Sequence, residues 1–121
     1  MKKNAILFSA SNYKKSSLIR ADDLPGVKYD IHAMYKRLTQ IGFEVKQIEN
    51  VSKDQIIPAL EDNASNSPCD AIHIVYFTGH GGHANGNNYI YPIDFASRFD
   101  TSKDIETSAM NIRDIISIYK G

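Results

Sequence analysis

The sequence has only one cysteine, Cys69, among its 121 residues. A single cysteine cannot form an internal disulfide or a cysteine-rich zinc site. Long hydrophobic runs are also lacking, because no apolar stretch approaches the roughly 18 residues of a membrane-spanning helix. The first residues do not have the length or the cleavage pattern of a signal peptide. We therefore expect a protein of the reducing cytoplasm, without a membrane partner.

An excess of charge of one sign is lacking as well, since 14 Lys and Arg balance 14 Asp and Glu. A neutral chain has no electrostatic basis for binding nucleic acid or an anionic membrane, so we expect neither as a partner. There are no internal repeats and no low-complexity tract. A chain of this length can bury a core as one domain, and we assign residues 1–121 to one domain.

Strand-like runs occur in four places. Residues 4–10 and 71–77 are apolar, and the second run, rich in Ile, Val, Tyr and Phe, predicts a buried strand. Residues 43–48 alternate between apolar and polar side chains, which predicts a half-buried strand near a sheet edge. Residues 89–94 form a short extended piece.

Helical spacing of apolar residues occurs in three segments. The clearest spans residues 27–41, with one apolar stripe. Ser52 begins a capping box, which predicts a second helix to about residue 64. Pro58 lies inside that helix and should distort it. A third helix is expected over residues 109–119.

The remaining segments, residues 11–26, 83–88 and 95–108, are expected to be loops or irregular. Strands and helices therefore alternate, which predicts an α/β fold with a mostly parallel sheet and helices on both faces. A fourth parallel strand should follow the last helix. The sequence ends where that strand would begin, so we expect the domain to be truncated before its fourth core strand.

The strand over residues 71–77 runs into the sequence Thr-Gly-His-Gly-Gly. The glycines beside His80 should let the backbone turn sharply and leave the imidazole at the carboxyl end of the strand. Ligands bind at that end in open α/β sheets. An imidazole titrates near neutral pH and can act as a general acid or base. From this motif alone, a catalytic histidine and a turn that merely contains a histidine are equally good interpretations.

Four short segments occur in order: Leu-Pro-Gly-Val-Lys-Tyr-Asp at 24–30, Ile-Gly-Phe-Glu-Val at 41–45, Phe-Thr-Gly-His-Gly-Gly at 77–82 and Tyr-Ile-Tyr-Pro-Ile-Asp-Phe at 89–95. Together they resemble the caspase-like cysteine peptidases, most closely the metacaspase and prokaryotic caspase branch. The resemblance covers nearly the whole chain. It implies a three-layer caspase-like fold and a protein or peptide substrate.

The resemblance implies catalytic roles for two residues. His80 matches the catalytic histidine, and Gly81 matches the residue whose N–H helps to form the oxyanion hole. The family's nucleophile, in an Asp-x-Cys setting after the fourth strand, has no match here. Cys69 cannot replace it, because an extended strand of roughly 30–35 Å, at about 3.3 Å per residue, separates it from His80. Thr78 has nothing that marks it as an activated nucleophile.

Substrate binding is the other role that the resemblance implies. Asp30 matches the acid that lines the S1 pocket in the branch that cleaves after Arg or Lys, where a carboxylate pairs with the basic side chain. Caspases that cleave after Asp carry an Arg near the position of Leu24. Arg20 lies in the same loop and keeps that specificity open. Asp22 and Asp23 are further candidate substrate contacts, and a solvated charged loop is the alternative.

We expect no metal and no cofactor. Zinc needs three or four ligands, and His80 with His83 supplies two. His73 lies within a strand and is expected to pack in the core or against a helix. The segment after the catalytic histidine, residues 84–88, has no carboxylate that would bind calcium.

Three functions remain. The favoured one is the His80-bearing portion of a cysteine endopeptidase whose cysteine lies in a further segment or small subunit. The second is a catalytically dead caspase-like module for protein–protein interaction, with an exposed sheet edge that accepts a partner's strand. The third is an unrelated flavodoxin-like domain with residues 9–12 as its ligand loop, although no phosphate-loop spacing supports it.

Overall fold

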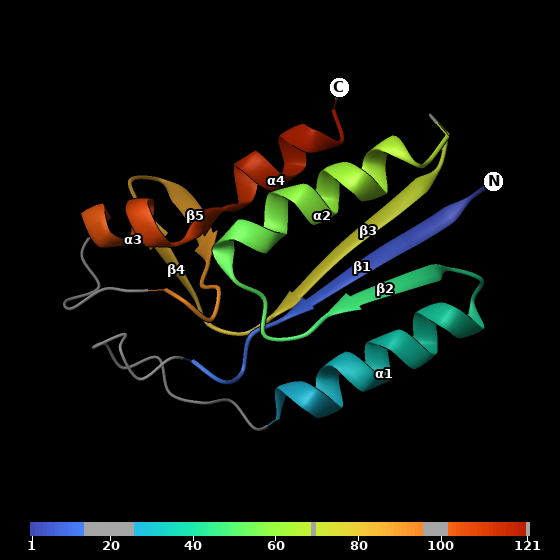
Figure 1. Ribbon diagram of the computed structural model, residues 1–121, viewed down its shortest axis with the longest axis horizontal. Coiled ribbons are helices and arrows are strands. Elements are labelled where there is room, and N and C mark those ends of the chain that lie inside the picture. The colour runs from blue at the N-terminus through green and yellow to red at the C-terminus, as the bar shows by residue number, and fades with distance from the viewer. Residues whose placement is uncertain (14–25, 69, 96–101, 121) are drawn as a thin grey trace.

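A parallel three-stranded sheet lies between helices in the computed structural model (Figure 1), which describes residues 1–13, 26–68, 70–95 and 102–120. The strand order is β2-β1-β3, and β1 pairs in parallel with both neighbours. A second, antiparallel sheet has the order β4-β5-β6. The elements in chain order are β1 (Lys3–Ser9), α1 (Val27–Gln40), β2 (Glu44–Ile48), α2 (Lys53–Ser65), β3 (Ile72–Thr78), β4 (Gly81–Ala84), β5 (Asn87–Ile90), α3 (Ser102–Ser108), β6 (Met110–Asn111) and α4 (Ile112–Ile118).

The central strand β1 is buried on both faces because its apolar residues are nearly continuous. Ala5 and Leu7 point toward α1, where they form a core with Ile31 and Leu38. The alternate residues Ile6 and Phe8 point to the opposite face, where α2 and α4 contribute the buried side chains Ile56, Leu60 and Ile115. Figure 1 shows α1 on one side of the sheet and α2 with α4 on the other. The predicted α/β architecture with helices on both faces is therefore confirmed.

The strand predicted before His80 is less buried than expected. β3 forms as expected, but most of its residues are half-buried, and Ile72 is 41% exposed. Among the described residues β3 pairs with β1 alone. Its apolar composition is typical of a central strand, but β3 lies at an edge of the described sheet because β1 is its one strand neighbour there. The edge position predicted for β2 is confirmed.

The first two helices match their predictions. α1 ends one residue earlier than expected, and α2 carries the Ser52 capping box, with the Gln55 side chain accepting from the Ser52 N–H at 2.8 Å. α2 runs unbroken through Pro58, so the proline does not end the helix. Pro58 removes the N–H that would bond to the Asp54 carbonyl. Both residues are exposed, so water can satisfy that carbonyl.

The loop predicted over residues 83–88 is in fact the hairpin of β4 and β5. Asn85 and Gly86 form its turn with φ of 49° and 81°, which is the two-residue turn that Asn-Gly favours. This dipeptide was the missed signal.

The last part of the chain also differs from its prediction. α3 lies within the segment predicted as irregular, and it buries Ile105. The helix predicted over residues 109–119 begins only at Ile112, because Met110 and Asn111 pair with β5 as β6. The Asn111 side chain then accepts a hydrogen bond from the Arg113 N–H at 2.9 Å and caps α4.

Candidate active site

His80 lies between the two sheets, two residues beyond the end of β3 and one before β4. It lies at the edge of the parallel sheet where β1 and β3 both end, since Ser9 is in register with Thr78. The backbones stay joined just past that point, where the Ala10 N–H donates to the Thr78 carbonyl at 3.0 Å. The half-buried His80 thus occupies the carboxyl edge, as its sequence position predicted.

A tyrosine four residues beyond the end of β1 lies beside His80. The Tyr13 hydroxyl accepts a hydrogen bond from the His80 N–H at 2.8 Å and donates one to the Tyr91 carbonyl at 2.9 Å. The Tyr91 N–H in turn donates to the His80 carbonyl at 2.9 Å. The rings of Tyr13 and His80 also pack together, with centroids 5.0 Å apart and tilted by 51°. No sequence motif pointed to Tyr13, and the motif at 89–95 that contains Tyr91 gave it no role.

The hairpin register determines where the Gly81 N–H points. Gly81 is opposite Ile90 in the hairpin. The Tyr91 N–H bonds to the His80 carbonyl in the adjacent pair, so Gly81 and Ile90 form a non-hydrogen-bonded pair. In such a pair, the N–H groups face away from the partner strand. The Gly81 N–H therefore points away from β5, on an exposed residue. This is the orientation that a backbone oxyanion donor needs.

The chain bends at Gly79, but the glycines around His80 do not have positive φ, and Gly79 and Gly82 are required for space. Gly42 and Gly86 are the glycines with positive φ in the described part of the chain, so Gly79 and Gly81 do not need that conformation. A Cβ at Gly79 would instead lie 2.9 Å from both the Ala10 carbonyl oxygen and the Tyr13 hydroxyl. A Cβ at Gly82 would collide with the Tyr91 ring.

Burial raises the pKa of Tyr13 to about 12, and this effect outweighs the hydrogen bond from the His80 N–H, which lowers the pKa. Only 4% of Tyr13 is exposed. The phenol therefore keeps its proton at neutral pH and can act as donor and acceptor at once.

The candidate substrate-binding residues are placed only in part. Asp30 is exposed in the first turn of α1, and α1 begins near the edge where the parallel strands end (Figure 1). Arg20, Asp22, Asp23 and Leu24 lie outside the described residues, as does Cys69.

The environment of His73 can be compared with its prediction. His73 packs against Tyr119, directly after α4, with ring centroids 4.8 Å apart, so its predicted packing against a helix is confirmed. Among the described residues, no group of three His, Cys, Asp or Glu side chains could hold a metal ion.

The end of β1 does not offer free backbone donors to a ligand. The Asn50 side-chain oxygen accepts hydrogen bonds from the Ser11 and Asn12 N–H groups, both at 3.1 Å. These are the groups that a ligand loop over residues 9–12 would use. The bonds argue against the flavodoxin-like alternative.

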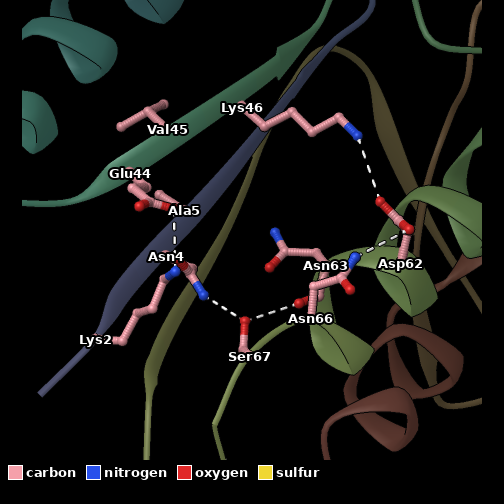
Figure 2. A pocket seen from close by; sticks show the side chains of 10 residues that line it. All are labelled: Lys2, Asn4, Ala5, Glu44, Val45, Lys46, Asp62, Asn63, Asn66 and Ser67. Atoms are coloured by element: carbon pink, nitrogen blue, oxygen red, sulfur yellow. Dashed lines mark hydrogen bonds and ion pairs between the residues drawn. The ribbon is translucent and has the colours of Figure 1, made fainter.

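A polar cavity of about 270 Å³ lies at the opposite, amino edge of the parallel sheet (Figure 2). Its side chains pair with one another: Asn4 bonds to Ser67, and Lys46 lies 4.0 Å from Asp62. This cavity is therefore separate from the edge that carries His80.

The sequence matches the caspase domain over residues 2–117. The chain belongs to the caspase domain family. No curated protein matches it. Membership of this peptidase family overturns the flavodoxin-like alternative and accounts for the layered α/β fold. Within the described residues of this caspase domain, no helix is long and apolar enough to span a membrane.

Proposed function

We propose that this caspase domain is the His80-bearing portion of a cysteine endopeptidase of the metacaspase and prokaryotic caspase type, which cleaves after Arg or Lys. The observation that supports this best is the pairing of His80 with the outward-facing Gly81 N–H at the carboxyl edge of the sheet. The nucleophilic cysteine belongs to a further segment or small subunit of the same peptidase. The substrate is a protein or peptide, and the compartment is the cytoplasm.

The proposed reaction is acyl transfer. The cysteine thiolate attacks the scissile carbonyl carbon, and the Gly81 N–H donates a hydrogen bond to the oxyanion that forms. The protonated His80 imidazole gives its proton to the leaving amine as the C–N bond breaks. Neutral His80 then takes a proton from water, which attacks the thioester and releases the acid product.

Substrate selection is assigned to the start of α1. The exposed Asp30 carboxylate pairs with the basic side chain that precedes the scissile bond, bidentately where that side chain is Arg. Arg20, Asp22 and Asp23 are proposed as further substrate contacts.

The first experiment is to sequence the native reading frame beyond codon 121. The proposal expects an apolar strand followed by Asp-x-Cys.

The second experiment replaces His80 with alanine in that longer polypeptide and measures cleavage of Arg and Lys peptides. Cleavage should be abolished with little change in Tm. His83→Ala is the matched control, because His83 is an exposed histidine on β4. Turnover retained by His80→Ala would exclude the catalytic role.

A catalytically dead interaction module is the second candidate. It is favoured by the β3 edge, which has no strand partner among the described residues. Unpaired edges accept strands from other chains. A reading frame that supplies no second cysteine would favour this function.

A further inference from the structure

We propose that Tyr13 is a positioning residue that holds the His80 backbone and thereby aims the neighbouring Gly81 N–H. The proposal rests on the proposed function, because it concerns how the two catalytic groups are oriented. Tyr13 is not itself assigned any contact with substrate.

The first argument is the interruption of the ladder beside His80. A hydrogen-bonded antiparallel pair exchanges two bonds, one from each N–H. His80 and Tyr91 keep one of them, from the Tyr91 N–H to the His80 carbonyl at 2.9 Å. The His80 N–H instead donates to the Tyr13 hydroxyl at 2.8 Å, which donates onward to the Tyr91 carbonyl at 2.9 Å. One phenol thus replaces one rung of the ladder.

This replacement acts at the residue before Gly81. Because the Tyr13 oxygen lies between them, the His80 N–H and the Tyr91 carbonyl are too far apart for a direct hydrogen bond. The bond from the Tyr91 N–H to the His80 carbonyl still holds the two strands together. The hairpin therefore opens on one side at His80. The peptide plane between His80 and Gly81 carries the N–H that would hold the oxyanion, together with the His80 carbonyl that accepts from the Tyr91 N–H at 2.9 Å. Tyr13 holds the preceding peptide plane through the His80 N–H, so the two bonds together fix the backbone on both sides of the His80 Cα.

The second argument is that the hydroxyl has a dedicated place. A Cβ at position 79 would lie 2.9 Å from the Tyr13 hydroxyl, so an alanine there would push against it. The Tyr13 ring packs on the imidazole of His80, with centroids 5.0 Å apart, and therefore restricts the side chain as well as the backbone. Glycine at position 79 thus leaves room for the Tyr13 hydroxyl, as it does for the Phe77 ring and the Ala10 carbonyl oxygen.

The third argument is chemical. The bridge requires one group that accepts and donates simultaneously, which a neutral phenol does and a phenyl ring cannot. Tyr13 is almost fully buried, so water does not readily take over this role. A Tyr13→Phe substitution would leave the His80 N–H and the Tyr91 carbonyl without that partner while keeping the ring.

The test compares Tyr13→Phe with Tyr119→Phe in the longer, cysteine-containing polypeptide. Tyr119 is a matched control, because its buried hydroxyl has no hydrogen-bond partner among the described residues. Tyr13→Phe should lower kcat by roughly 10- to 100-fold and leave KM nearly unchanged, because misaimed oxyanion donors weaken transition-state binding. Tyr119→Phe should retain the wild-type kcat. A wild-type kcat in Tyr13→Phe overturns the inference. Equal losses of kcat in Tyr13→Phe and Tyr119→Phe would overturn it as well.

The two proposals can fail separately. If His80→Ala is inactive and Tyr13→Phe has full kcat, the positioning role is wrong and the proposed function stands. If His80→Ala is active, the proposed function is wrong whatever Tyr13→Phe does.

Amide hydrogen exchange, measured by NMR on the unsubstituted 121-residue chain, tests the bridge without a variant. The His80 amide should exchange at least tenfold more slowly than the outward-facing Gly81 amide, because it donates to a buried hydroxyl. Equal exchange rates at the two amides would contradict the bridge even if Tyr13→Phe did not fold.

Discussion

The Tyr13 hydroxyl lies 2.8 Å from the backbone nitrogen of His80, although 67 positions separate the two residues in the sequence. They meet because β1 and β3 are parallel neighbours in register, so the residues that follow both strands emerge at one edge. The contact ties the segment after β1 to the candidate catalytic histidine. Charge at Asp30, space at Gly79, backbone conformation at Gly86 and protonation of Tyr13 can each be measured separately.

Asp30→Ala in the cysteine-containing polypeptide should reduce kcat/KM for Arg and Lys peptides by roughly tenfold or more, because it removes the carboxylate that is proposed to pair with the basic side chain. Cleavage of other peptides should change little. Asp54→Ala is the matched control, since Asp54 is also an exposed acid in the first turn of a helix. An equal loss on every substrate would indicate that Asp30 acts through helix stability.

Gly79→Ala should lower the free energy of unfolding by about 1–3 kcal/mol, because the new Cβ overpacks the site. One of the atoms that it would approach is the Ala10 carbonyl oxygen at 2.9 Å, which the backbone holds in place. Urea unfolding measures the change. Gly26→Ala is the control, because a Cβ there meets nothing within 4 Å and its φ of −70° suits alanine. Equal unfolding free energies for the two variants would show that position 79 has room for a side chain.

Gly86→Ala should lower the free energy of unfolding by about 1 kcal/mol for a different reason. A Cβ there meets nothing within 4 Å, but the φ of 81° is one that side chains rarely adopt. Replacement with asparagine, which tolerates this region better, should recover part of the loss. If alanine and asparagine were equally stable there, the turn conformation would not be the cause.

Alkaline pH should destabilise the domain through Tyr13. Its pKa is about 12 in the folded chain and 10.0 ordinarily, so the folded state holds a proton that the unfolded state releases between these values. The stabilisation is complete below pH 10 and is lost as the pH rises toward 12, by on the order of 2–3 kcal/mol.

Tyr119, whose pKa is also raised by burial, contributes in the same direction. The comparison is therefore between the wild type and Tyr13→Phe, with urea unfolding from pH 8 to the highest pH at which the fold persists. The wild type should show the steeper decline above pH 10. Parallel curves would mean that the phenol of Tyr13 is not the group that titrates.

The elements that the sequence predicted well are those that local periodicity specifies. α1 and α2 follow from helical apolar stripes and a capping box, and β1 follows from a run too apolar to lie at the surface. The helix predicted over residues 109–119 starts too early because strand pairing with a distant segment overrides the local pattern. Met110 and Asn111 fit a helix locally, but pairing with β5 makes them a strand.

The candidate site was half predictable. Position in the motif was enough to place His80 at the end of a strand, and the family resemblance attached a role to Gly81. The direction of the Gly81 N–H could not be predicted from residue order, because it depends on the register of a hairpin whose sequence predicts a loop. The roles of Arg20, Asp22 and Asp23 stay predictions, as those residues lie outside the described part of the chain.

The sequence by itself determined the alternation of strands and helices, the membership of the caspase domain family and the position of His80 after its strand. These properties depend on neighbours in the chain, on periodicity and on short motifs. Only the tertiary structure decided that Tyr13 meets His80, that Gly79 is required for space and that β3 lies at an edge of the described sheet. Each of these depends on which distant segments are packed together, and hydrophobic burial and strand pairing determine that packing through the whole chain at once.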